Sequence, residues 1–129
     1  MPVLTQSPLI GDVVKYEDNL NYTREVVTLK SGLNYLIGTI LGIVTATGKY
    51  TVSPNAETGG IEGAETAKAV LIENVDATGA DKVALVLRRG PSIVADAALI
   101  YEASVNDGTK KATKRAQLVA VGIVPRTAV

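Results

Sequence analysis

Short apolar runs separated by turn-forming residues dominate the chain from residue 25 onward. Runs that favour strands occupy residues 26–29, 35–46, 49–52, 67–75, 82–89, 93–94 and 98–101. Thr47 and Gly48 separate two of these runs and predict a hairpin, and Gly38 and Gly42 predict bulges or a close approach of two backbones. Because Val, Ile and Thr are frequent in the runs, the pattern predicts a mainly β domain with a sandwich-like or barrel-like core.

The pattern changes to a helical period near the C-terminus, which makes the expected fold a small, β-rich α+β domain. A helix is predicted over residues 109–121, with Asn106 or Asp107 as its cap. Gly122 is a suitable end for this helix, and Pro125 prevents its continuation. Apolar residues recur on one predicted face at Ala112, Ala116 and Val119.

Residues 1–23 look least like the rest of the domain, because Pro2 and Pro8 interrupt any regular strand pairing. Three apolar pairs nevertheless run through this stretch: Val3 and Leu4, Leu9 and Ile10, and Val13 and Val14. Disordered spacers seldom carry such pairs. We interpret residues 1–23 as an extended arm that binds another surface, followed by a β-rich domain over residues 24–129. Packing of the arm on its own domain is the alternative.

The composition of the 129 residues excludes several kinds of chemistry. The chain has no Cys, so it has no disulfide and no thiolate metal site, and it has no His, so the catalytic arrangements that use His or Cys are excluded. The carboxylates of Glu17 with Asp18, and of Glu62 with Glu65, lack the ligand spacing of a calcium loop. A glycine-rich stretch at 59–63 is not followed by the Lys of a phosphate-binding loop. We therefore expect no enzyme activity, no metal and no cofactor.

The 13 acidic and 13 basic residues cancel, but they are unevenly distributed. Residues 108–129 contain five basic residues and no acid, whereas residues 57–81 contain six acidic residues and one basic residue. No aromatic residues are interleaved with the basic ones between 110 and 115, so we expect no nucleic-acid binding. The apolar run 35–46 is shorter than the roughly 20 residues that span a membrane, so we expect no membrane partner.

An ordered set of short stretches resembles the head decoration proteins of tailed phages, the family of phage lambda protein D. The stretches are 24–32 (REVVTLKSG), 38–50 (GTILGIVTATGKY), 69–72 (AVLI), 76–78 (DAT), 86–90 (VLRRG) and 117–124 (QLVAVGIV). The lambda protein is shorter through the first sheet region and has aromatic residues that are missing here. Individual subunit contacts are therefore not transferred.

The resemblance implies a homotrimer on the outside of an expanded phage capsid, where it holds neighbouring major capsid proteins together. It implies a protein made in the host cytoplasm and located on the virion, with an N-terminal arm that faces the shell. The residues expected to bind the capsid are Val3, Leu4, Leu9, Ile10, Val13 and Val14. Two alternatives stay open: another virion part, such as a head–tail adaptor or tail-tube subunit, and a small ligand-binding or carbohydrate-binding β module.

Overall fold

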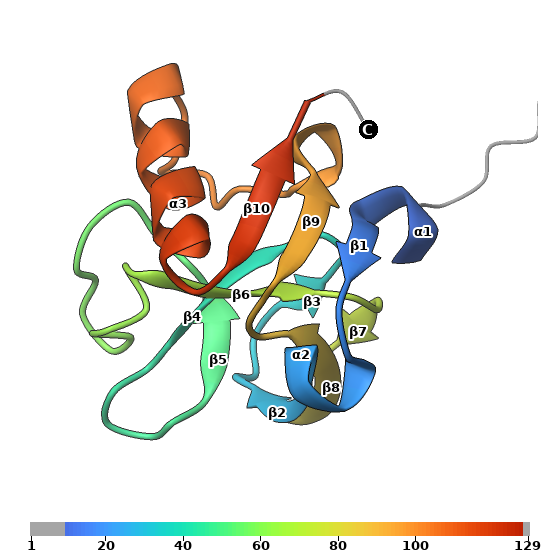
Figure 1. The fold of residues 1–129 in the computed structure, drawn as a ribbon. Helices are drawn as coiled ribbons and strands as arrows, with labels where there is room; N and C mark the ends of the chain where they lie inside the picture. The colour runs from blue at the N-terminus through green and yellow to red at the C-terminus, as the bar shows by residue number, and fades with distance from the viewer. Residues whose placement is uncertain (1–9, 128–129) are drawn as a thin grey trace, which may run out of the picture.

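Five of the strand-forming runs pair into a closed barrel in the computed structural model, which describes residues 10–127 (Figure 1). Around the barrel the strands follow the order β2 (Arg24–Leu29), β5 (Tyr50–Val52), β4 (Ile40–Ile43), β6 (Ala67–Leu71) and β8 (Lys82–Leu87). Antiparallel pairing of β2 with β8 closes the barrel, and among the barrel strands that the structure describes only β2 and β5 pair in parallel. The predicted fold class is confirmed, and the core is a barrel and not a sandwich.

Alternate side chains of the strands fill the barrel, because successive residues of a strand point to opposite faces. The buried residues of this inner core are Leu29, Tyr35, Leu41, Tyr50, Ala69, Leu71, Ala77, Ala84 and Val86. In a chain without Phe or Trp, Tyr35 is the largest fully buried side chain. Its hydroxyl donates to the Lys30 carbonyl at 2.6 Å, so the polar end of this core residue is satisfied.

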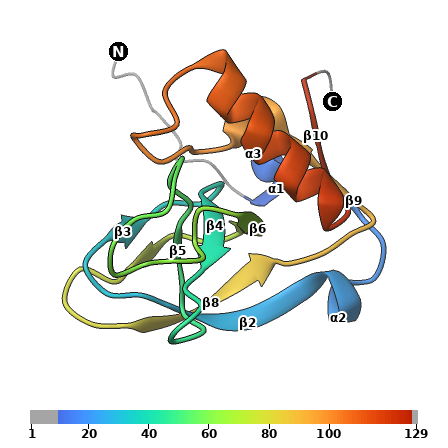
Figure 2. The ribbon, with the colours of Figure 1, turned by 90° about the vertical axis from the view of Figure 1, so that its left-hand side faces the viewer.

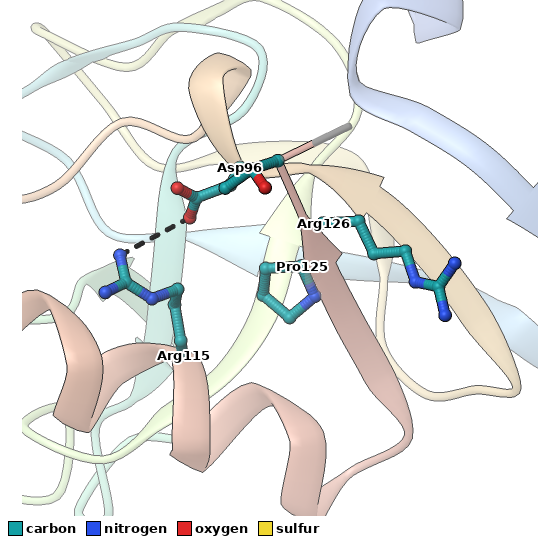
Figure 3. A pocket seen from close by; sticks show the side chains of 5 residues that line it. Asp96, Arg115, Pro125 and Arg126 are labelled. Carbon is teal, nitrogen blue, oxygen red and sulfur yellow. Dashed lines mark hydrogen bonds and ion pairs between the residues drawn. The ribbon is translucent and has the colours of Figure 1, made fainter. Parts of the chain in front are cut away.

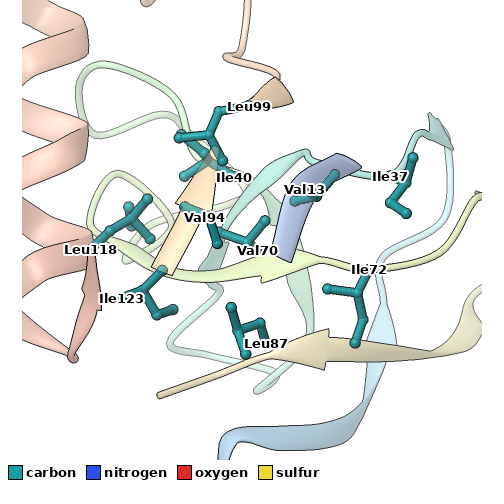
Figure 4. Packing of buried hydrophobic residues seen from close by; sticks show 11 residues of the cluster. Val13, Ile37, Ile40, Val70, Ile72, Leu87, Val94, Leu99, Leu118 and Ile123 are labelled. Carbon is teal, nitrogen blue, oxygen red and sulfur yellow. The ribbon is translucent and has the colours of Figure 1, made fainter. Parts of the chain in front are cut away.

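A second core lies outside the barrel, where the outward side chains of β4, β6 and β8 meet a three-stranded sheet and a helix. The sheet and the helix lie together on one side of the barrel (Figure 2). In this sheet β9 (Ser92–Ala95) pairs antiparallel with β1 (Val14–Glu17) and parallel with β10 (Ile123–Arg126). The buried residues of this outer core are Val13, Ile37, Ile40, Ala67, Val70, Ile72, Leu87, Val94, Leu99, Leu118 and Ile123 (Figure 4). Strands β4, β6 and β8 thus contribute side chains to both cores.

The predicted hairpin and close approaches are confirmed. Strands β4 and β5 form an antiparallel hairpin, and Gly48 in its turn has a φ of 73°. A Cβ at Gly42 would lie 2.0 Å from the Ala64 carbonyl oxygen, and one at Gly38 would lie 2.2 Å from that of Ala98. Glycine is therefore required at both positions.

Two of the long predicted runs are each divided by a turn. Residues 35–46 contain the end of β3 (Asn34–Tyr35) and all of β4, and residues 67–75 contain β6 and the start of β7 (Val75–Asp76). Strands β3 and β7 pair with each other beside the barrel. The predicted strand at residues 98–101 is wrong: η1, a 3₁₀ turn, covers Asp96–Ala98, and Ile100 makes only an isolated bridge to Thr39.

Helix α3 (Gly108–Ala120) confirms the predicted C-terminal helix within a residue at each end. The Asp107 side chain caps it by accepting from the Lys110 amide at 2.8 Å, and Gly122 follows its end with a φ of 89°. The predicted apolar face is wrong, because Ala112 and Ala116 are exposed and Val119 is 51% exposed. The helix instead buries Leu118 and Lys114.

Residues 10–23 pack on their own domain, the alternative left open above. They form α1 (Ile10–Val13), β1 and α2 (Leu20–Thr23), and not a single extended segment. Val13 and Thr23 are both 0% exposed. Of the apolar pair, Val13 therefore lies in the outer core, and Val14 begins β1 and packs against that core.

Candidate functional site

One end of the molecule collects the two ends of the described chain, and we call it the terminal face (Figure 1, Figure 2). It consists of α1, η1, Arg115 of α3 and residues 125–127. Helix α1 contacts both η1 and β9. Because β10 runs parallel to β9 and pairs Arg126 with Ala95, the last described residues lie next to η1. The terminal face thus contains Ile10, the first residue that the structure describes.

The structure divides the six predicted capsid-binding residues. Val13 is fully buried in the outer core, and Ile10 and Val14 are partly buried against it. Val14 also pairs with Val94 across β1 and β9. Val3, Leu4 and Leu9 lie outside the described residues. Contact of these six residues with a capsid stays a prediction, and Val13 could join it only by leaving the core.

A polar lock fastens residues 14–23 to the barrel. The Arg24 guanidinium, at the start of β2, donates to the Glu17 carboxylate at 2.5 and 3.0 Å, and the Thr23 hydroxyl donates to it at 2.7 Å. Burial works to raise the pKa of Glu17, but the hydrogen bonds from Arg24 and Thr23 outweigh it, and the pKa is lowered. The lock therefore favours the ionised carboxylate and holds this segment against the barrel.

A pocket of about 470 Å³ opens on the terminal face between α3, η1 and β10. Asp96, Arg115, Pro125, Arg126 and Thr127 line it (Figure 3). Arg115 reaches Asp96 from α3, at 3.5 Å between nitrogen and oxygen. Arg126 lies on the other side of Pro125, and its guanidinium points away from the other two side chains (Figure 3). The pocket lining thus carries two cations and one anion.

Tyr101 extends the charged cluster behind this pocket. Its hydroxyl lies 3.3 Å from the Asp96 carboxylate and 3.4 Å from the Arg115 guanidinium, and the Lys111 ammonium lies 5.4 Å from the centre of its ring. Burial raises the pKa of Tyr101, so the phenol stays protonated at neutral pH. Positive charge therefore exceeds negative charge in this group of side chains.

A second polar lock lies under α3 and determines which face of the helix is buried. The Lys114 ammonium donates to three oxygens: the Ser53 hydroxyl at 2.8 Å, the Pro54 carbonyl at 2.6 Å and the Glu65 carbonyl at 2.5 Å. Burial lowers the pKa of Lys114. Because the side chain is 1% exposed, these bonds replace its hydration, and they attach α3 to both ends of the 54–66 loop.

Exposed apolar side chains form a separate patch on the outer wall of the barrel. Val26 on β2 and Val83 on β8 are 66% and 68% exposed. Val26 pairs with Leu85 and Thr28 pairs with Val83, so all four side chains lie on the same face of the sheet. We call this set the valine patch. Clustered exposed β-branched residues of this kind are typical of a surface that another protein covers.

Two kinds of site are absent from the part of the chain that the structure describes. Within residues 10–127 no three or more Asp and Glu side chains gather as a metal site would require. No helix in that range is both long and apolar enough to cross a membrane. The described residues form a small β-barrel domain with a charged face and an exposed apolar wall.

Residues 3–123 match the family model of the bacteriophage lambda head decoration protein D. The match covers most of the chain, so the protein belongs to this family of phage head decoration proteins. No curated protein matches it. The family is structural and its place is the virion capsid, and the resemblance inferred from the sequence is confirmed.

The charged pocket was missed by the sequence reasoning. Asp96 and Arg115 are 19 positions apart, and nothing in the local pattern pairs them. The available signal was the excess of basic residues in 108–129, which indicated a charged surface without locating it. The burial of Lys114 was also missed, because a basic residue in such a stretch is expected to be solvated.

Proposed function

We propose that this protein binds the outside of the expanded phage capsid as a homotrimer and holds neighbouring major capsid proteins together. The family match over residues 3–123 is the observation that carries the proposal. In this proposal the protein is made in the host cytoplasm, binds no nucleic acid and catalyses no reaction. Its partners are further copies of itself and the major capsid protein.

The terminal face is the side that meets the capsid in this proposal. Ile10 lies on this face, and in the proposal Val3, Leu4 and Leu9 supply apolar contacts to the shell together with Ile10, Val13 and Val14. An extended segment can add main-chain hydrogen bonds to a strand edge of a partner. Three such segments on one trimer would raise the effective concentration of the contacts and slow dissociation.

The valine patch supports the proposal that copies of the chain associate. Two valines about two-thirds exposed cost free energy in water, at roughly 25 cal/mol for each Å² of apolar surface. A subunit interface removes that cost without disturbing the barrel, whose core lies on the other face of the same strands.

Light scattering coupled to gel filtration tests the association, and binding to expanded, undecorated shells tests the function. We expect three copies per particle and saturable binding to shells. Val83→Asp should lower the trimer fraction while leaving the fold intact, and Lys82→Asp is the matched control on the adjacent exposed residue. A monomer that leaves shells unoccupied would contradict the proposal, and a larger ring would favour an adaptor or tail-tube subunit.

A further inference from the structure

The pocket on the terminal face is not used by residues 1–9 in the function proposed above, and its charges point to a ligand of its own. We propose that the pocket between α3, η1 and β10 binds an acidic segment of the major capsid protein, with carboxylates that meet Arg115 and Arg126. This inference rests on the proposed function, and it adds the chemistry of the partner and a second point of attachment.

Arg126 is the first support, because its guanidinium has donors to spare. Within residues 10–127 it makes no hydrogen bond or ion pair, and the residue is exposed. A guanidinium offers five N–H donors in a planar fork that matches a carboxylate. The Arg126 guanidinium can therefore donate to a carboxylate without giving up an existing partner.

Arg115 is the second support, because its existing bonds are long. Its nitrogen lies 3.5 Å from Asp96 and 3.4 Å from the Tyr101 hydroxyl, whereas charge-assisted bonds of this type are usually about 2.7–2.9 Å. The Asp96 carboxylate thus only partly neutralises Arg115. A second carboxylate in the pocket would find an attractive field, strengthened by Lys111 next to Tyr101.

The arrangement of the two arginines selects the kind of ligand. They lie on opposite sides of Pro125, and the Arg126 guanidinium points away from Arg115 (Figure 3). A single small anion would satisfy one of them, whereas a chain segment with several Asp or Glu residues would reach both. The pocket also opens on the face that contains α1, so one capsid subunit could contact both.

The first experiment measures binding of a fluorescein-labelled hexaglutamate peptide to the full-length protein by anisotropy at low salt, with hexaglutamine as the neutral control. We expect binding that weakens as salt is added. Arg126→Glu should weaken it by about three- to tenfold, whereas Arg126→Lys, which keeps the charge but loses the planar fork, should weaken it less than Arg126→Glu does. Lys82→Glu on β8 is the matched charge reversal outside the pocket and should have little effect.

A variant that should strengthen binding shows whether the pocket recognises the peptide or whether its residues only support the fold. Asp96→Asn removes the competing carboxylate and keeps the shape of the side chain, so hexaglutamate should bind about two- to fivefold more tightly. A disturbed fold would weaken binding instead. Equal binding of hexaglutamate by the parent, Arg126→Glu and Asp96→Asn would overturn the proposal.

The second experiment compares occupancy of expanded shells by the parent and by Arg126→Glu at equal trimer concentration. Lower occupancy for the variant supports the pocket as a capsid contact. If the parent decorates shells and the variant does so equally well, the pocket proposal fails and the proposed function stands. If Arg126→Glu changes the number of copies per particle and not the occupancy, the pocket binds another copy, which also overturns the proposal. Failure of the parent itself to bind shells would refute the proposed function.

Discussion

The inner and outer cores are both apolar, but they are held together in different ways. The inner core lies inside a closed barrel, and hydrogen bonds between neighbouring strands, including β2 with β8, keep the ring closed. The outer core brings α1, near the N-terminus, together with β9, α3 and β10, which lie between residues 92 and 126. Two polar locks fasten these pieces, Glu17 with Arg24 and Lys114 with the 54–66 loop. The barrel thus closes on itself, whereas the outer layer depends on packing and on these locks and supplies the terminal face.

The sharpest way to test this comparison is to remove the N-terminal piece of the outer core. Deleting residues 1–23 should unfold the domain or leave a molten outer layer, because it removes the fully buried Val13 and the Glu17 carboxylate. Deleting residues 1–9 should leave the melting temperature almost unchanged while lowering shell occupancy. Circular dichroism and shell binding measure both effects. A stable, cooperative fold without residues 1–23 would show that the barrel needs no outer layer.

Leu118 tests the contribution of α3 to the outer core. Leu118→Ala should lower the free energy of unfolding by about 2–5 kcal/mol, because it leaves a cavity at a fully buried position. Val119→Ala on the exposed face of the same helix is the control and should change stability by no more than about 0.5 kcal/mol. Urea denaturation measures both. Similar losses for the two variants would contradict the orientation of α3.

Lys114 tests whether the outer layer depends on its polar lock. Lys114→Met keeps most of the side-chain volume but leaves the Pro54 and Glu65 carbonyls without their donor, and we expect a loss of about 2–4 kcal/mol. Lys110→Met, at the exposed start of the helix, should change stability by no more than about 0.5 kcal/mol. A neutral result for Lys114→Met would mean that water replaces the ammonium at no cost.

Glu17 gives the smallest expected effect and a dependence on pH. Because its pKa is lowered on folding, its contribution to stability is complete above the unfolded pKa of about 4.3 and is lost as pH falls through the folded value. Glu17→Gln should lower stability by about 1–2 kcal/mol at pH 7 and flatten the loss at acid pH. Thermal melts between pH 2 and pH 7 measure this. Parallel curves for parent and variant would contradict the lock.

What could be predicted from the sequence follows from local periodicity. The apolar runs that became β2, β5, β6 and β8 needed no partner to be recognised, because strand propensity and turn residues are local signals. The cap at Asp107 and the end at Gly122 are equally local. Strands β1 and β10 had no such signal: β1 has the mixed sequence VKYE, and β10 contains Pro125. These two segments form strands because they pair with β9, and not because of their own strand propensity.

The sequence by itself determined the family, the β-rich class, the C-terminal helix and the exclusion of catalysis by His or Cys. Only the tertiary structure decided which side of α3 is buried, where residues 10–23 pack, and that Asp96, Arg115 and Arg126 line one pocket. The reason is physical: propensity, capping and turn formation act between neighbours in the chain. Burial of an ammonium group or convergence of distant charges depends on which segments the fold brings together.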